Sequence, residues 1–133
     1  MAKNEAYKER NEAFLAELRN REGVKEISQG VLYEVINSGK GGKHPALHNV
    51  VTVYYKGTLI NGKEFDNSYK RGYPEAFRLS DLIVGWQIAL TQMSVGDCWR
   101  VFIPQELGYG KRASGPIPGY STLVFEMELV AIM

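Results

Sequence analysis

The sequence predicts an α+β fold: about five antiparallel strands, one short helix that covers the sheet, and a further helix at the N-terminus. Three features support this prediction. Residues 1–26 are rich in charged and helix-forming residues; apolar and more polar residues alternate in several segments after Gly30; and one segment, 81–93, places its apolar residues at helical spacing. A chain of 133 residues, 44% of them hydrophobic, forms one domain with room for a short appendage.

The N-terminal segment is the predicted appendage. Residues 1–26 hold twelve charged side chains, and neither proline nor glycine occurs before Gly23. This composition favours a helix of about four to five turns, within a charged helix and linker that we place at residues 1–28. Its apolar residues form a narrow stripe: Tyr7, Phe14, Leu15 and Leu18. The stripe is too narrow to enclose a core, so we expect it to pack on the rest of the domain or on a second copy of itself.

Strands are predicted where apolar and more polar residues alternate with a period of two. These segments are residues 31–36, 50–56, 98–103 and 122–131. The second of them leads through Leu59 to Asn61 and Gly62, a dipeptide that predicts a tight hairpin turn of type I′. Residues 63–66 then form the returning strand, which brings the sheet to about five antiparallel strands.

A single short helix is predicted between the strands, over residues 81–93, with Ser80 or Asp81 as its N-cap. Its apolar side comprises Ile83, Trp86, Leu90 and Met93. Bulky side chains along one side of a helix can cover one face of a strongly twisted sheet, so we expect this helix to complete the core.

Charge and hydropathy exclude two classes of partner. The formal net charge is only +1, too small for a protein that binds nucleic acid through its overall charge. No apolar run approaches the length of a membrane span and the N-terminus is charged, so we expect neither a span nor an uncleaved signal peptide. The single cysteine, Cys98, cannot form an internal disulfide and fits a reducing compartment. We therefore expect a cytoplasmic protein, with a periplasmic or cell-surface location as the alternative if a signal peptide has been removed.

Side chains for nucleophilic or metal chemistry are scarce. The two histidines, His44 and His48, have no carboxylate at a motif spacing, so neither a metal site nor a histidine-based triad is predicted. The glycine-rich loop at 39–44 lacks the pattern of a phosphate-binding loop, and we expect no cofactor. The second half of the chain is instead rich in aromatic residues, more than one small sheet and one short helix readily bury. A shallow aromatic-lined pocket is consistent with this surplus.

Several short motifs after residue 50 are more specific than composition. They are Val53–Leu59 (VYYKGTL), Asn61–Ser68 (NGKEFDNS), Ile83–Trp86 (IVGW), Gln92–Gly96 (QMSVG), Leu107–Gly110 (LGYG), Ile117–Pro118 and Thr122–Leu129 (TLVFEMEL). In this order and at this spacing they resemble the FKBP-type peptidyl-prolyl cis–trans isomerases, and the resemblance covers about residues 29–133. The junction at residues 22–35 is similar to two-part bacterial members of the macrophage-infectivity-potentiator type. In those members a longer helical N-terminal domain dimerises, whereas this chain has a shortened helix.

The resemblance implies a half-barrel sheet wrapped round the short helix, with the site between them. Carried over position by position, Trp86 is the floor of the pocket, and Asp66 and Tyr109 are a polar pair at its rim. Arg71 is the neighbour that holds Asp66. The walls are aromatic at Tyr55, Phe65 and Phe125 and aliphatic at Leu82, Ile83 and Ile117. We predict that Asp66, Tyr109, Trp86 and Phe125 are the catalytic residues and that the others bind substrate.

The resemblance also implies a function: acceleration of rotation about X–Pro bonds in unfolded or proline-containing polypeptides, with macrolides as inhibitors. Two alternatives on the same fold remain open, a non-catalytic module that binds proline-containing chains and a folding chaperone. Glu75, where many members have phenylalanine, favours the binding module. The short segment from Tyr109 to Ile117 disfavours the chaperone, because members of that type carry an inserted domain there. We expect a monomer or a weak homodimer through the N-terminal helix.

Overall fold

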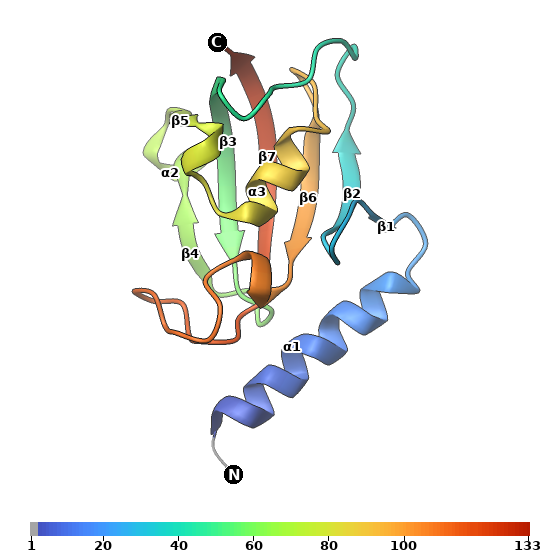
Figure 1. The fold of residues 1–133 in the computed structure, drawn as a ribbon, viewed down its shortest axis with the longest axis vertical. Helices are drawn as coiled ribbons and strands as arrows, with labels where there is room; N and C mark the ends of the chain where they lie inside the picture. The colour runs from blue at the N-terminus through green and yellow to red at the C-terminus, as the bar shows by residue number, and fades with distance from the viewer. Residues whose placement is uncertain (1–2) are drawn as a thin grey trace.

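A seven-stranded antiparallel sheet forms the centre of the molecule in the computed structural model, which describes residues 3–133 (Figure 1). The strands follow the order β1-β2-β6-β7-β3-β4, and β5 pairs with the same edge of β3 as β4 does. Their bounds are β1 (Lys25–Glu26), β2 (Leu32–Asn37), β3 (Val50–Thr58), β4 (Glu64–Asn67), β5 (Glu75–Arg78), β6 (Cys98–Ile103) and β7 (Leu123–Ile132). The predicted α+β class and antiparallel sheet are confirmed. The strands absent from the prediction are the short edge pieces β1 and β5.

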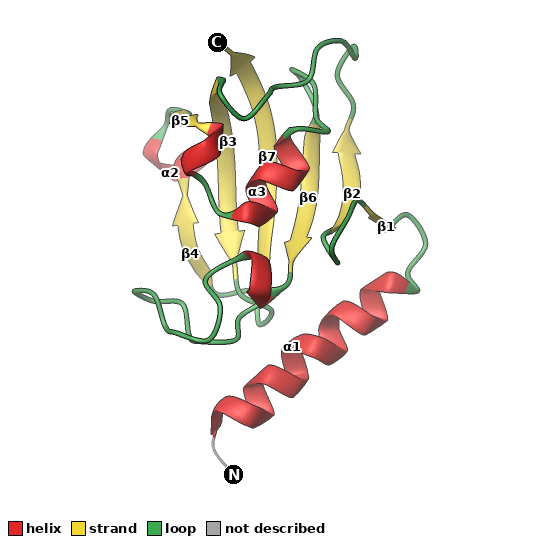
Figure 2. Cartoon of the chain, viewed as in Figure 1, coloured by secondary structure: helices red, strands yellow, loops and turns green. Residues whose placement is uncertain are grey.

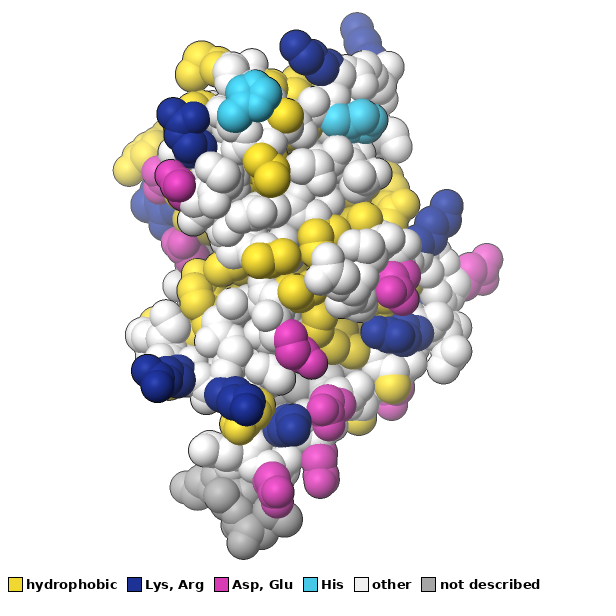
Figure 3. Space-filling model, viewed as in Figure 1, with side chains coloured by type: hydrophobic (Ala, Val, Ile, Leu, Met, Phe, Trp, Pro, Cys, Tyr) yellow, Lys and Arg dark blue, Asp and Glu magenta, His cyan; other side chains and the backbone are white. Residues whose placement is uncertain are grey.

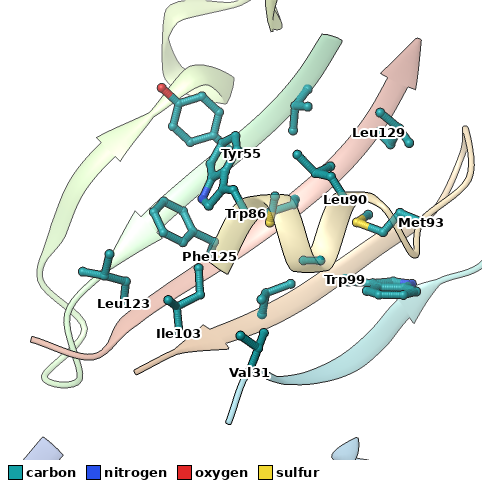
Figure 4. Close-up of a cluster of buried hydrophobic side chains, with 14 of the residues drawn as sticks. Val31, Tyr55, Trp86, Leu90, Met93, Trp99, Ile103, Leu123, Phe125 and Leu129 are labelled. Atoms are coloured by element: carbon teal, nitrogen blue, oxygen red, sulfur yellow. The ribbon is translucent and has the colours of Figure 1, made fainter. Parts of the chain in front are cut away.

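Helix α3 (Val84–Leu90) lies across one face of this sheet and encloses the core (Figure 2). Burial alternates along β3, so that Val51 and Val53 face the helix, as a period of two requires. Figure 4 shows side chains of α3 meeting those of β3, β6 and β7. The helix approaches closely at Gly85, where a Cβ atom would overlap the Ile103 side chain. This close approach holds the first turn of α3, and the tryptophan in it, against the sheet.

The start of α3 differs from the prediction. Residues Leu79–Asp81 form a separate 3₁₀ turn, and Leu82 and Ile83 are extended before the helix begins at Val84. Ile83 is the N-cap, and no side chain caps the helix. Ser80 and Asp81 are therefore not its caps. The short link places Leu82 and Ile83 immediately before the first turn of α3, where both line the cleft described below.

The predicted type I′ turn is also wrong. Of its two central residues only Gly62 has a positive φ, at 86°, whereas type I′ needs two. The connection instead runs from Leu59 to Lys63. Within it the Leu59 N–H donates to Lys63 O, and the Gly62 N–H donates to Leu59 O, both at 2.9 Å. This five-residue loop carries a glycine at its left-handed position. The returning strand β4 follows it as expected.

Helix α1 (Lys3–Arg19) packs against the face of the sheet opposite to α3. Leu18 is buried there with Leu32 and Phe102, and the ring of Phe14 lies 6.2 Å from that of Phe102. The apolar stripe thus contacts the sheet of its own chain, the first of the two arrangements that the sequence left open. In Figure 1, α1 runs obliquely past the ends of β2 and β6. No helix in residues 3–133 is long and apolar enough to cross a membrane.

Candidate active site

A cleft of about 530 Å³ lies between α3, the β4–β5 edge of the sheet and the loop that follows β6. Figure 3 shows a band of hydrophobic side chains across the middle of this face of the molecule. The cleft is lined by aromatic, aliphatic and polar residues, and its six aromatic side chains are Tyr55, Phe65, Phe77, Trp86, Tyr109 and Phe125. A cavity of this size and lining is typical of a site for a small apolar group.

Trp86 lies at the centre of the aromatic lining and is only 4% exposed. Its ring meets those of Tyr55 and Phe125 almost at right angles, with centroids 5.0 and 5.2 Å away (Figure 4). Phe65 meets Phe125 in the same edge-to-face manner at 5.6 Å. Edge-to-face contacts are the favoured geometry of aromatic pairs, so the rings fix one another in place. The floor and walls are therefore preformed.

The indole N–H of Trp86 is shielded from solvent, and no hydrogen-bond acceptor for it is found within residues 3–133. A buried donor without a polar partner is uncommon. The rings of Tyr55, Phe77 and Phe125 stand nearly perpendicular or tilted around it, and aromatic faces are weak acceptors. The floor of the cleft is thus poor in hydrogen-bonding groups.

A charged network borders this apolar floor. The Tyr55 hydroxyl donates to Asp66 Oδ2 at 2.6 Å, and Arg71 Nη1 donates to Asp66 Oδ1 at 2.6 Å. Arg71 also donates to the Tyr55 oxygen at 3.2 Å, while its other nitrogens hold Glu75 Oε2 at 2.9 and 3.0 Å. The backbone N–H of Asn67 donates to Asp66 Oδ1 at 2.9 Å. Both carboxylate oxygens of Asp66 therefore accept hydrogen bonds.

The network moves the pKa values of its members apart. Burial raises the pKa of Tyr55 to about 12, and the carboxylate of Asp66 adds to the effect. Burial opposes ionisation of Asp66, yet the hydrogen bonds from Tyr55 and Arg71 outweigh it and hold the pKa of that carboxyl below its ordinary value. Tyr55 is neutral and Asp66 is ionised across the whole physiological range.

A one-turn helix, α2 (Ser68–Arg71), delivers Arg71 to this network. Asn67 caps it by accepting the N–H of Lys70 at 3.2 Å, and Gly72 ends it in the left-handed conformation at φ 88°. Ser68 is buried and its hydroxyl accepts the N–H of Tyr55 at 2.8 Å. The turn is therefore tied to the strand that carries Tyr55, and this tie sets the distance between Arg71 and the tyrosine.

The mouth of the cleft offers free hydrogen-bond donors. The N–H of Ile83 and the hydroxyl of Tyr109 have no hydrogen-bond partner in the described chain, and Tyr109 is 45% exposed. Across the mouth, Ser114 and Ile117 exchange two backbone hydrogen bonds of 2.8 and 2.9 Å. That short bridge turns the side chain of Ile117 inward, where it is 5% exposed. The mouth can therefore grip an extended chain through its backbone.

The structure brings together the site residues predicted from the sequence. All of them line the cleft except Arg71, which lies behind Asp66 as the neighbour that holds it. Sequence reasoning missed five lining residues: Phe77, Asp81, Ser114, Gly115 and Pro116. The alternation of Glu75–Arg78 could have indicated the strand that carries Phe77. The residues at 114–116 carry no periodic signal, because a loop conformation places them.

Comparison with known proteins gives two family matches. The family described as FKBP-type peptidyl-prolyl cis-trans isomerase matches residues 41–130. A second family, described as the domain amino terminal to FKBP-type peptidyl-prolyl isomerase, matches residues 1–35.

Individual relatives agree with these matches. The chain is 48% identical over 132 residues to the FKBP-type peptidyl-prolyl cis-trans isomerase FkpA of Escherichia coli. This alignment covers 98% of this chain and 47% of that protein. The chain is 40% identical over 131 residues to the outer membrane protein MIP of Legionella longbeachae, covering 98% and 56%. The chain thus spans about half the length of the curated relatives it matches.

Solved structures give the same result. The crystal structure of FkpA from Escherichia coli superimposes with a TM-score of 0.88 at 44% identity, covering 98% of this chain and 62% of that one. A peptidyl-prolyl cis-trans isomerase from Pseudomonas syringae pv. tomato superimposes with a TM-score of 0.90 at 38% identity, covering 99% and 97%. The similarity to the second structure therefore extends over almost all of both chains.

Proposed function

The chain belongs to the FKBP-type peptidyl-prolyl cis-trans isomerase family, and on this premise we propose that its cleft accelerates rotation about X–Pro bonds in polypeptides and so assists folding. One observation carries the proposal: a preformed aromatic cleft, floored by Trp86 and poor in hydrogen-bonding groups, opens at a mouth with free donors. Such a site needs no nucleophile and no proton transfer to perform this reaction.

The physical basis is the polarity of the imide. An X–Pro amide is planar through resonance, and rotation has a barrier of about 20 kcal/mol. The twisted transition state loses this resonance, so it is less polar and depends less on solvation by water. A dry cleft therefore disfavours the planar ground state more than the twisted state. Each difference of about 1.4 kcal/mol gives about a tenfold rate increase.

Each part of the cleft has a role in this proposal. Trp86 and Phe125 receive the proline ring, while the Ile83 N–H and the Tyr109 hydroxyl hold carbonyl groups of the substrate chain. Asp66 orients Tyr55 rather than contacting the rotating carbonyl, since its oxygens are already engaged by Tyr55, Asn67 and Arg71. Phe65, Leu82 and Ile117 complete the walls that bind substrate.

The test is a protease-coupled assay on a short X–Pro peptide, with Trp86→Leu and Trp99→Leu as matched variants. Both tryptophans are buried, but Trp99 stacks on Tyr33 at 4.3 Å, outside the cleft lining. We expect Trp86→Leu to lose at least about tenfold in kcat/KM, since it removes the flat floor of the cleft. Trp99→Leu should keep the kcat/KM of the wild type. Tyr109→Phe should lose about threefold to tenfold, the effect of one hydrogen bond. A wild-type rate equal to that of buffer would overturn the proposal.

The non-catalytic binding module is the weaker alternative. The residue that favoured a binding module was Glu75, and its carboxylate contacts Arg71 instead of lining the cleft. The chaperone alternative needs an inserted domain between Tyr109 and Ile117, where the chain has only a short loop. We further propose macrolides as ligands of the same cleft, and competition between a macrolide and a proline peptide tests this.

For compartment and assembly we propose a periplasmic or cell-surface location and a monomer. The name of the Legionella longbeachae relative, outer membrane protein MIP, supports the cell envelope over the cytoplasm that Cys98 suggested. Packing of Leu18 and Phe14 on the chain's own sheet supports the monomer, since a partner helix would need the same side chains. Cell fractionation and sedimentation of the full chain test the two statements.

A further inference from the structure

Helix α1 makes polar contacts with the segment that enters β7. Asn11 Oδ1 accepts the backbone N–H of Thr122 at 2.7 Å, and the Tyr7 hydroxyl lies 2.8 Å from Ser121 Oγ. Ser121 Oγ donates its own hydrogen to Pro118 O at 2.7 Å, so Tyr7 is the donor in the first of these contacts. These contacts join parts of the chain more than a hundred residues apart.

Asn11 is built into this contact. It is 2% exposed, although asparagine is a poor helix former and is usually found at the surface. Its second polar atom is also used, because Nδ2 donates to Tyr7 O at 2.8 Å. Thr122 is 1% exposed, so loss of Asn11 would leave a buried N–H without an acceptor.

The contacted segment leads directly to the mouth of the cleft. Ser121 holds the carbonyl of Pro118, and the preceding residue, Ile117, lines the cleft. Tyr120 N–H donates to Gly110 O at 2.9 Å, and the residue before Gly110 is Tyr109. Both sides of the loop at the mouth are thus tied to the residues that α1 contacts.

Tyr120 shows why this segment needs support. Its φ is 65°, in the left-handed region that residues with a Cβ atom rarely adopt. Such a conformation persists only where the surroundings hold it. Lys8 Nζ lies 5.5 Å from the centre of the Tyr120 ring, a third contact from α1 to the segment.

The apolar part of α1 is a separate anchor. Phe14 and Leu18 pack on Phe102 and Leu32, about two and three turns further along the helix from Tyr7. Removal of one polar contact therefore leaves the helix docked on the sheet. The polar contacts can be tested without removing α1 from the domain.

We infer that α1 braces the mouth of the cleft, and that Asn11 and Tyr7 are positioning residues for the isomerase reaction. This inference rests on the proposed function, because its consequence for catalysis needs an active cleft. The two side chains act through residues 120–122 on Tyr109 and Ile117, which grip the substrate. On this basis α1 positions the cleft, while residues 29–133 contain it.

The test uses Tyr7→Phe and Asn11→Leu, with Tyr33→Phe as the control for loss of a tyrosine hydroxyl outside the cleft and the brace. One lost hydrogen bond of ordinary strength corresponds to about threefold to tenfold in an equilibrium constant. We expect KM for an X–Pro peptide to rise by this factor while kcat changes little, because the mouth binds ground state and transition state alike. Tyr33→Phe should leave both constants unchanged.

Amide hydrogen exchange gives a second readout that does not need catalysis. The N–H groups of Ile117 and Tyr120 should exchange about threefold to tenfold faster in both variants, while that of Val53 in the core strand stays unchanged. Unchanged KM and unchanged loop exchange in both folded variants would overturn the brace. If the wild-type chain were inactive, the proposed function would fail, yet loop exchange and the affinity for a proline peptide would still decide the inference.

Discussion

Gly57 on β3 is the position at which the smallest substitution should affect the cleft most. It lies opposite Asp66 on β4 and opposite Phe125 on β7. A Cβ atom at Gly57 would stand 2.6 Å from two ring carbons of Phe65 and 2.8 Å from one of Phe125. These two rings form the edge-to-face pair that walls the cleft. Glycine is required here for space rather than for backbone freedom.

The geometry sets the size of the effect of Gly57→Ala. Carbon atoms pack best about 3.5–4.0 Å apart, so each ring must retreat by about 1 Å. Added volume in a packed core costs about 1–3 kcal/mol of the free energy of unfolding. Displacement of reacting groups by about 1 Å can lower a rate up to about a hundredfold. We therefore expect kcat/KM to fall at least about tenfold while the protein stays folded at 25 °C.

Gly62→Ala is the matched control, since it makes the same glycine-to-alanine substitution in the loop between β3 and β4, away from the cleft. Gly62 has a φ of 86° and nothing lies within 4 Å of its Cβ position, so alanine there costs backbone strain of about 1–2 kcal/mol and touches no ring. Both variants should unfold earlier in urea, and only Gly57→Ala should lose activity in the protease-coupled assay. If Gly57→Ala kept full kcat/KM while its aromatic NMR shifts showed displaced rings, the spacing of the walls would not govern catalysis.

Further predictions concern the charged network. We expect kcat/KM to be constant from about pH 5 to pH 9, because the pKa of Asp66 lies below its ordinary value of 3.8 and that of Tyr55 is about 12. A change in kcat/KM near neutral pH would contradict this. Asp66 stabilises the fold fully above pH 3.8 and loses this effect as pH falls through its lower folded value, so urea unfolding of wild type should weaken more steeply in acid than that of Asp66→Asn. Tyr55 contributes stability below pH 10 that is lost toward pH 12, and Tyr55→Phe should remove that alkaline loss. Glu75→Leu should change kcat/KM by less than about threefold, since an exposed ion pair contributes little and Arg71 keeps Asp66.

Local periodicity was enough for the elements that carry strong patterns. The alternation in residues 50–56 and 122–131 predicted the strands β3 and β7, because a buried face forces a period of two. The start of α3 was misplaced, since a 3₁₀ turn and an α-helix draw on similar residues and Ser80 resembles a cap. The turn at Asn61 was misjudged because the strand register, rather than the dipeptide, sets the loop length.

The cleft was predictable only in part for a similar reason. Motifs placed Trp86, Tyr55 and Phe125, whose positions follow from regular elements. Ser114 and Pro116 reach the cleft through a loop closed by the bridge between Ser114 and Ile117, which joins backbone groups and leaves no trace in side-chain pattern. Long-range hydrogen bonds of this kind depend on the whole fold.

The docking of α1 shows which signal was available and not used. The apolar stripe left two arrangements open because Phe14 and Leu18 are equally suited to a sheet or to a second helix. Asn11 distinguishes them: asparagine is a poor helix former, and although its Nδ2 donates to Tyr7 O within the helix, its buried Oδ1 needs a donor from outside the helix. In the structure that donor is the N–H of Thr122, on the chain's own sheet. Substitution of Asn11 therefore probes the docking more directly than substitution of any residue in the stripe.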